Sequence, residues 1–270
     1  MTAALFLPEG HLFTPTGFAR GPWDPSALHG GPVGALLARA VEQVPGDGVP
    51  MDVARLTVEL LRPVPLDPLE VHAELVRPGR KIHLVEATLR HAESGTELAR
   101  ARALRIRHAE VPLPFDDPAI ADHLEPEPPP PGPAGARRER STFAASDVAF
   151  HTDGAEHRFV SGSWAEPGPV TVWIRLLVPV VPGEEPTGLQ RTVAAADFGN
   201  GISRVLPFET HLFINPDLTL HLLRPPVGEW VGMATRTHLG PHGAGLAESA
   251  LFDERGRVGR SVQSLLVDLR

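Results

Sequence analysis

Apolar residues near the start of the chain recur at the spacing of an amphipathic helix. From residue 33 onward they fall at positions i, i+3, i+4, i+7, i+8 and i+11, which are Val33, Leu36, Leu37, Ala40, Val41 and Val44. This spacing places them on one face of a helix. Pro32 suits the first helical position, and Pro45 cannot continue the helix. The pattern therefore predicts a helix over residues 32–44 with one buried face.

Alternation of apolar and polar positions predicts β-strands elsewhere in the chain. It is clearest in a stretch that occurs twice, LTVELLRP at residues 56–63 and LTLHLLRP at residues 218–225, in which six of eight letters are identical. The Arg-Pro that follows ends each strand, because proline cannot donate a hydrogen bond to a neighbouring strand. The similarity continues at the same offset of 162, from EATL at 86–89 to ESAL at 248–251. Two similar halves are therefore expected, each ending in an antiparallel meander.

The second half also contains a candidate helix, over residues 197–213, although Gly199, Gly201 and Pro207 each lower its helix propensity. Each half then consists of a central helix followed by several strands whose apolar face can wrap that helix. Such elements form an α+β layer architecture. We expect the sheets of the two halves to pair edge to edge, because a separate sheet would leave its edge strand without hydrogen-bond partners.

The segment between the halves is rich in proline, with four in succession at residues 128–131. Such a composition favours extended polyproline conformation over packing. It is also typical of ligands of SH3-type domains, but between two similar halves a spacer is the simpler interpretation. We therefore expect an N-terminal repeat at residues 1–110, a linker at 111–140 and a C-terminal repeat at 141–270.

Composition narrows the functional classes. The 270 residues include no cysteine, which excludes disulfides, thiolate metal sites and a cysteine nucleophile. The formal net charge of −8 disfavours a nucleic-acid partner. The first ten residues lack a basic segment and their apolar run breaks at Pro8, so neither a signal peptide nor a membrane span is expected. These features predict a cytoplasmic protein.

Four motifs together resemble the acyl-CoA thioesterase II family. They are HGG at 29–31, AAADFGNGIS at 194–203, DLTLHLLRPPVGEW at 217–230 and GRSVQSLL at 259–266. The resemblance spans nearly the whole chain outside the linker. It implies a double hotdog fold, in which two repeats each have a central helix wrapped by an antiparallel sheet. It also implies hydrolysis of acyl-CoA to a free acid and coenzyme A, without metal or other cofactor.

The resemblance also implies site residues. Members of the family use an Asp, a Thr and a Gln to hold and activate water; Asp197 and Gln263 match the first and last. Asn215 stands at the position of the Thr, a departure that puts the rate of hydrolysis in doubt more than the geometry. Among uncharacterised thioesterase-like proteins that the chain also resembles, Asn at this position looks usual.

The chemistry of thioester hydrolysis suits these residue types. It needs a directed water, a group that takes its proton, and donors for the oxygen that becomes negative. Asp197, placed at the start of the helix predicted over 197–213, would be the base or orient the water. Asn215 and Gln263 offer both donors and acceptors to that water. The backbone N–H groups of Gly199, Asn200 and Gly201 would bind the oxyanion, since helix N-termini present free donors.

The two halves provide an internal comparison for these candidates. Their counterparts in the first half are His29, Val53 and Arg102, so none of the three polar residues is repeated. A trio needed only for folding would be expected in both halves, and we therefore expect one active site per chain. His29 would line that site from the other half or would only begin its helix.

Several alternatives remain open at this point. Asp197 could be only a helix N-cap, Gln263 only a buried amide in a strand, and Asn215 only the start of a turn. The same fold could also serve an enoyl-thioester hydratase, which would need an Asp/His pair in one motif, whereas the His nearest to Asp197 in the sequence is His211. A third alternative is a non-catalytic protein that binds acyl-CoA. By analogy with other hotdog proteins we expect a homo-oligomer.

Overall fold

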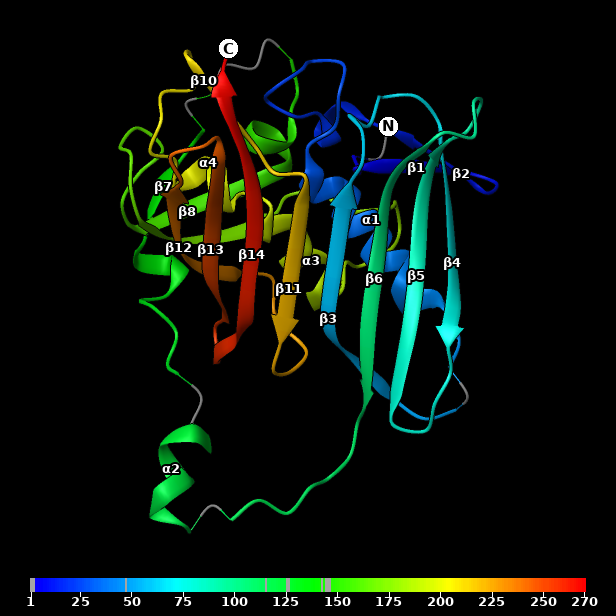
Figure 1. Ribbon diagram of the computed structural model, residues 1–270, viewed down its shortest axis with the longest axis vertical. Coiled ribbons are helices and arrows are strands. Elements are labelled where there is room, and N and C mark those ends of the chain that lie inside the picture. Colours follow the sequence, from blue (N-terminus) through cyan, green and yellow to red (C-terminus); the bar gives the residue numbers. More distant parts are fainter. Residues whose placement is uncertain (1–2, 47, 115, 125–126, 142, 144–146) are drawn as a thin grey trace.

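The computed structural model describes residues 3–46, 48–114, 116–124, 127–141, 143 and 147–270. Within them, 14 antiparallel strands form one sheet (Figure 1). They are β1 (Phe6–Glu9), β2 (Leu12–Pro15), β3 (Met51–Leu60), β4 (Leu69–Arg77), β5 (Ile82–His91), β6 (Glu97–Arg107), β7 (Arg137–Glu139), β8 (Ala155–Ser161), β9 (Val170–Leu176), β10 (His211–Ile214), β11 (Asp217–Leu222), β12 (Val231–Leu239), β13 (Ala244–Asp253) and β14 (Gly256–Leu269). Their order is β1-β2-β4-β5-β6-β3-β11-β14-β13-β12-β9-β8-β7, and β10 pairs with β14.

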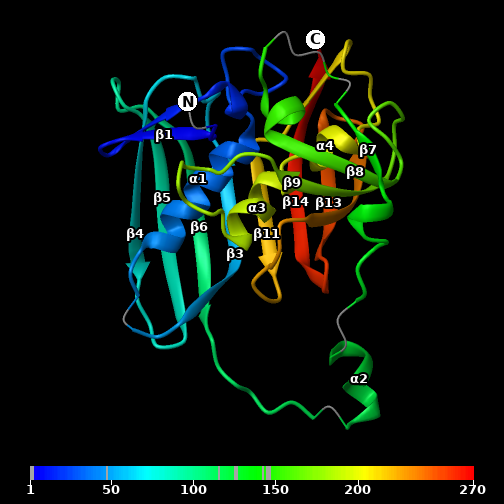
Figure 2. The ribbon, with the colours of Figure 1, turned by 180° about the vertical axis from the view of Figure 1, so that it is seen from behind.

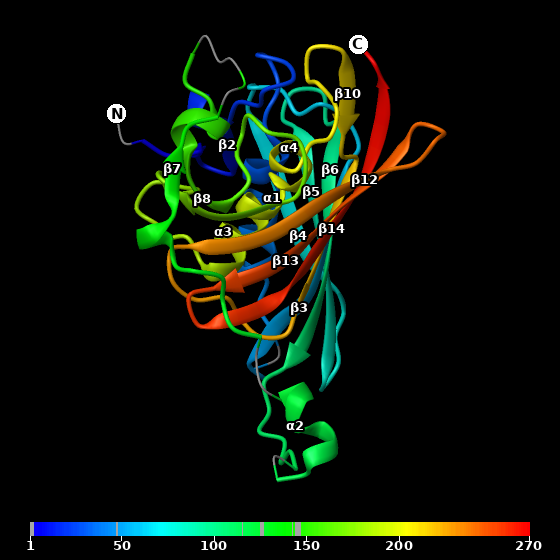
Figure 3. The ribbon, with the colours of Figure 1, turned by 90° about the vertical axis from the view of Figure 1, so that its left-hand side faces the viewer.

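Two helices cover one face of this sheet, as Figures 2 and 3 show. They are α1 (Gly30–Gln43) and α3 (Gly188–Ala196). The protein thus has the expected mixed α+β architecture. The shorter helical segments are η1 (Gly17–Ala19), α2 (Pro118–Leu124), η2 (Pro133–Gly135), η3 (Phe150–Gly154) and α4 (Gly199–Ile202). None of the described helices is long and apolar enough to cross a membrane.

Helix α1 confirms the helix predicted over residues 32–44. Most of its apolar residues are fully buried, among them Val33, Leu36 and Leu37. It approaches α3 closely because it carries glycines on the facing side: a Cβ at Gly31 would lie 2.5 Å from the carbonyl oxygen of Ala194. The two helices thus meet with backbone close to backbone, which brings the first turn of α1 next to the end of α3.

The helix predicted to begin at Asp197 is wrong in position. The main helix of the second half is α3, which ends at Ala196, so that Asp197 is its C-cap residue. Thr187 begins this helix, because its side chain accepts a hydrogen bond from Gln190 N. After Asp197 only the four-residue α4 follows. The chain leaves the helix at Asp197 and Phe198, so Asp197 does not lie at a helix N-terminus, where the helix dipole would favour its ionised form.

The repeated strands lie next to each other in the middle of the sheet. Strands β3 and β11 pair antiparallel, with Thr57 opposite Thr219. These two threonines are equivalent in the repeat, and Thr219 Oγ1 donates to Thr57 Oγ1 at 3.2 Å. Equivalent residues face each other in this way at a local two-fold axis. The repeat therefore joins the two halves edge to edge, as expected.

The predicted linker extends from β6 and projects from the body of the protein with α2 at its far end (Figure 1). Residues 115 and 125–126 of this segment lie outside the described residues. Its last residues are not part of a linker, since β7 pairs antiparallel with β8 at the edge of the sheet, and side-chain contacts hold the preceding residues against the same half. Trp173 Nε1 donates to the carbonyl oxygen of Pro131 at 2.7 Å, and Arg257 NH1 donates to Glu127 Oε2 at 2.5 Å. The second part of the linker is thus held against the C-terminal half.

Candidate active site

The structure brings together the three polar residues singled out in the second half. Asp197 lies at the end of α3, Asn215 precedes β11, and Gln263 lies in β14. Asn215 Nδ2 donates to Asp197 Oδ1 at 2.7 Å, and Gln263 Nε2 lies 3.4 Å from the same oxygen. All three are buried, with at most 9% of each residue exposed. Two amides thus face one carboxylate.

The first half contributes a further group to this carboxylate. His29 is the N-cap residue of α1, and its Nδ1 lies 2.8 Å from Asp197 Oδ2. Nδ1 is also 3.1 Å from Gly31 N. An unprotonated Nδ1 would direct its lone pair at the carboxylate oxygen, and the two acceptors would repel each other. We therefore assign a proton to Nδ1, which then donates to Asp197. His29 both begins its helix and lines the site, and 168 positions separate it from Asp197.

These partners set the charge of Asp197. Burial is the largest single influence and acts to raise the pKa of its carboxyl group, while the charge of the adjacent His29 and its hydrogen bond act to lower it. Hydrogen bonds from Asn215 and from the Gly31 N–H add to that effect, so the pKa of Asp197 lies below its ordinary value. The carboxylate is therefore ionised at neutral pH. A residue that only caps a helix would contact the backbone of its own helix, whereas Asp197 contacts side chains from both halves of the chain.

The glycine-rich segment after Asp197 is placed differently from the expectation. Asn200 N donates to Gln263 Oε1 at 3.1 Å, and Asn200 Nδ2 donates to the carbonyl oxygen of Phe213 at 2.8 Å. The backbone N–H of Asn200 is therefore already hydrogen-bonded to Gln263 and cannot bind the oxyanion. A Cβ at Gly199 would lie 2.7 Å from Gln263 Oε1, so glycine is needed for this close approach. Gly201 lies beyond, and the nearest atom to a Cβ there would be in the Phe143 ring at 3.9 Å.

A cavity of about 490 Å³ opens beside the carboxylate. Asp197, Asn215 and Asn200 form its polar wall, and His29 and Gly30 bring the start of α1 to it. The remaining wall is largely apolar and includes Trp23, Leu28, Val33, Leu60, Val64 and Leu212. Such a combination of an apolar wall with a few convergent polar groups is typical of small-molecule sites.

Two further histidines lie behind His29 and were not singled out from the sequence. Burial first, then the neighbouring His29, lowers the pKa of His151 to about 4. Burial, His151 and His29 lower the pKa of His157 to about 3. The His157 ring packs edge-on against Phe198, with ring centroids 4.6 Å apart. Nothing in their spacing indicates this arrangement, because η3 and β8 bring them to His29 only in the fold.

Within the described residues, no three His, Asp or Glu side chains gather in a way that could hold a metal ion. The groups of the site are instead a carboxylate, an imidazole and amides. These can orient a water molecule and exchange a proton with it. They are placed at the wall of an apolar cavity, which suits a substrate with one reacting polar group and a hydrocarbon part.

Comparisons with known proteins agree with this combination of sheet, helices and site. The fold is similar to that of a hotdog-fold protein of unknown function from Alicyclobacillus acidocaldarius, at 17% identity and a TM-score of 0.69, covering 98% of this chain and 95% of that one. A putative thioesterase II from Thermobifida fusca YX gives 18% identity and a TM-score of 0.70, with 97% and 95% covered. At such identities the likeness shows the fold alone, and it places this chain among hotdog proteins.

The particular family follows from sequence models of two domains. The model of the acyl-CoA thioesterase N-terminal domain matches residues 19–106, and that of the C-terminal domain matches residues 118–267. The chain therefore belongs to the acyl-CoA thioesterase family and is a thioester hydrolase. The acyl-CoA thioesterase II TesB2 from Mycobacterium marinum is similar in fold, at 17% identity and a TM-score of 0.61, with 97% of this chain and 93% of that one covered. Curated protein sequences give no significant match.

Proposed function

We propose that this chain hydrolyses acyl-CoA thioesters to a free acid and coenzyme A, with water activated beside Asp197. The observation that carries the proposal is the buried, ionised carboxylate, which His29 of one half and two amides of the other hold at the wall of an apolar cavity. The family supplies the substrate class, and the apolar wall suits the acyl chain.

In this mechanism the water oxygen attacks the thioester carbonyl carbon, a C–O bond forms and the C–S bond breaks. The carboxylate of Asp197 has about four lone-pair sites, and His29, Asn215, Gln263 and the Gly31 N–H all point at them. The contact from Gln263, at 3.4 Å, is the longest of the side-chain contacts. We infer that the water binds Asp197 Oδ1 from the cavity in place of this long contact, since Asp197 lines the cavity and Gln263 lies behind it.

The orientation of the Gln263 amide follows from a second contact. Its Oε1 accepts from Asn200 N, so its Nε2 must face Asp197. A water bound at Asp197 Oδ1 on the cavity side donates one proton to the carboxylate and keeps a lone pair for the attack. The proton then moves to the thiolate sulfur that leaves. Because the pKa of Asp197 is low, we assign it the role of orienting the water and stabilising the charge of the departing proton.

The oxyanion needs donors on the other side of the carbonyl group. We infer that the first turn of α1 provides them, in place of the segment Gly199–Gly201. Gly30 lines the cavity, and the first N–H groups of a helix have no acceptor within it. A Cβ at Gly30 would lie 2.8 Å from Asp197 Oδ2, so only glycine brings the backbone this close to the carboxylate. Loss of one such donor costs about 3 kcal/mol in other enzymes.

We also propose that the two halves are two hotdog repeats, joined by the linker that begins at residue 111 and ends before β7. The pairing of β3 with β11 at Thr57 and Thr219 supports this interpretation, since it relates the halves by a local two-fold axis. The active site draws on both repeats, with His29 from the first and Asp197 from the second.

The test is a thiol-release assay over a series of acyl-CoA chain lengths. We expect Asp197→Asn to lower kcat/KM by about 10²- to 10³-fold, the usual loss when one electrostatic contact to a transition state is removed. Glu59→Gln is a matched control, because it makes the same chemical change at an exposed carboxylate on β3. Equal rates for wild type and Asp197→Asn would exclude this mechanism. Binding without thiol release would indicate the non-catalytic acyl-CoA-binding protein.

A second candidate function is hydration of an enoyl thioester. One observation favours it: the Asp/His pair that such a lyase requires, absent from any single motif, is formed in the fold by Asp197 and His29 at 2.8 Å. The same assay run with an enoyl-CoA decides between the two reactions. A hydroxyacyl product without released thiol would select the hydratase.

A further inference from the structure

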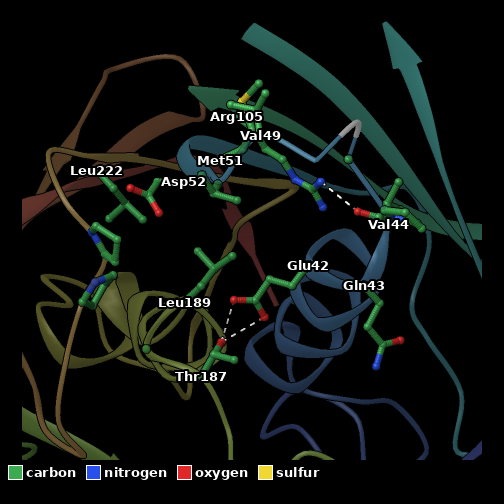
Figure 4. Close-up of a pocket in the computed structure, with 16 residues that line it drawn as sticks. Glu42, Gln43, Val44, Val49, Met51, Asp52, Arg105, Thr187, Leu189 and Leu222 are labelled. Atoms are coloured by element: carbon green, nitrogen blue, oxygen red, sulfur yellow. Dashed lines mark hydrogen bonds between the residues drawn. The ribbon is translucent and has the colours of Figure 1, made fainter. Parts of the chain in front are cut away.

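A second cavity, of about 460 Å³, lies at the opposite ends of α1 and α3. The C-terminal turn of α1 and the first turn of α3 form one side of it, and the start of β3 and the segment after β11 form the other (Figure 4). Glu42 points into this cavity, with Leu189, Leu222 and Asp52 around it.

The repeat relates this cavity to the one beside Asp197. Several residues that line one cavity have a counterpart 162 positions away that lines the other, and 162 is also the offset between the repeated strands. The pairs are Leu60 and Leu222, Pro63 and Pro225, Val64 and Pro226, Asp52 and Ile214, and Val53 and Asn215. The local two-fold axis at Thr57 and Thr219 therefore carries the first cavity onto the second.

The second cavity also contains a carboxylate bound by groups from the other half of the chain. Thr187 Oγ1 lies 2.8 and 2.9 Å from the two carboxylate oxygens of Glu42, and Gln190 Nε2 donates to Glu42 Oε2 at 2.9 Å. Thr187 is the N-cap residue of α3, just as His29 is the N-cap residue of α1. In both cavities a carboxylate at the end of one helix thus meets the N-cap residue of the other.

The two carboxylates differ in charge environment. Burial raises the pKa of Glu42, and the hydrogen bonds from Gln190 and Thr187 and the charge of Arg105 only partly offset this. Arg105 is itself buried and is engaged by the end of α1, where its NH1 donates to the carbonyl oxygen of Val44 at 2.9 Å. A base is most effective when its pKa is close to the working pH, so the environment of Glu42 favours proton transfer.

Glu42 also retains room for a water molecule. The Thr187 hydroxyl has one proton to donate and Gln190 Nε2 makes one contact, so two of about four lone-pair sites are used. Gly188 and Leu189 line the same cavity in the first turn of α3, where backbone N–H groups lack acceptors within the helix. A carboxylate, a hydroxyl, an amide and backbone donors are therefore assembled around one cavity.

We propose that the second cavity is a second hydrolytic site for acyl thioesters, in which Glu42 is the base. The substrate class rests on the function proposed above. Glu42 takes a proton from water as the water oxygen bonds to the carbonyl carbon, and the Gly188 and Leu189 N–H groups bind the oxyanion. The C–S bond then breaks, and the proton passes from Glu42 to the thiolate sulfur.

The test compares wild type, Asp197→Asn, Glu42→Gln and the double variant by thiol release from one acyl-CoA. We expect Asp197→Asn to retain a residual rate that Glu42→Gln lowers at least tenfold further. Glu184→Gln is the matched control: its carboxylate lies near the same helices but binds Arg39 at 2.6 Å and does not line the cavity. Melting curves check that each variant folds. Val53→Trp, which fills the second cavity from β3, must remove the same residual rate.

The outcomes separate this site from the first. An unchanged rate when Glu42→Gln or Val53→Trp is added to Asp197→Asn overturns the second site and leaves the proposed function standing. A rate lost in Glu42→Gln alone, with Asp197→Asn as active as wild type, overturns the first site and supports the second. Absence of thiol release from the wild type overturns both.

Discussion

The buried histidines His151 and His157 predict that the protein loses stability in mild acid. Both are almost fully buried, at 2% and 1% exposure. Burial is the main reason why the pKa of His151 falls to about 4 and that of His157 to about 3, from an ordinary value of 6.5. The folded state therefore keeps both rings neutral where the unfolded state binds protons. The stability that this neutrality contributes is complete above pH 6.5 and is lost as the pH falls from 6.5 toward 4 for His151 and toward 3 for His157.

The magnitude follows from proton linkage. At pH 5 the protein has lost about 2 kcal/mol of stability for each of the two rings. The reason is that protonation of a histidine in the unfolded chain favours that chain by about 1.36 kcal/mol for each pH unit below the unfolded pKa of 6.5. The two rings together amount to about 4 kcal/mol. For a protein of this size that corresponds to a fall of about 10 °C in Tm between pH 7 and pH 5.

The assay is thermal unfolding at pH 7, 6 and 5 for wild type and for the double variant His151→Phe/His157→Phe. We expect the variant to lose most of the difference in Tm between pH 7 and pH 5. His108→Phe is the matched control, since 74% of the side chain of His108 is exposed. A double variant whose Tm falls as steeply with pH as that of wild type would refute the reasoning.

Three further predictions concern packing. Gly31→Ala should destabilise the protein by about 2 kcal/mol and lower thiol release, because its Cβ would meet backbone of α3 at 2.5 Å, whereas at Gly34 the same change meets a side chain that can move. Arg224→Met should lower the free energy of unfolding in urea by about 3 kcal/mol, since it leaves the buried Asp253 carboxylate without the two contacts of 2.5 and 2.6 Å. Trp173→Phe removes one of the two side-chain hydrogen bonds that hold the linker, and limited proteolysis should then cut the linker faster than in wild type.

Local patterns were sufficient for much of the fold. The apolar spacing predicted α1, and the alternation and the repeat predicted β3, β11 and the edge-to-edge pairing of the two halves. Such features are determined by residues that are close in the sequence, or are revealed by the similarity between the two halves. The helix of the second half was misplaced because its stretch, GLQRTVAAA, has few large apolar residues, while the segment after Asp197 drew attention by its counterpart in the first half.

The candidate site was predicted only in part. The polar residues of the second half were singled out because their positions match those that the resembled family uses, and their absence from the first half supported that choice. The fold brings Asp197, Asn215 and Gln263 together. The contact between His29 and Asp197 could not be derived, since it depends on how closely two helices from different halves pack. The pKa values of buried groups depend in the same way on neighbours that only the fold defines.

The local two-fold axis explains where the halves agree and where they differ. Strands β3 and β11 pair with each other, so a side chain at Thr57 meets its own counterpart at Thr219, and a change in one copy alters the same contact. Residues that face the cavities do not contact their own counterparts, because the two members of an equivalent pair lie in different cavities. Each member can therefore change without altering the other. Asn215 lines one cavity while Val53 lines the other. The two halves can therefore share a central pair of strands and still place Asp197 and Glu42 in different cavities, where the pKa of Asp197 is lowered and that of Glu42 is raised.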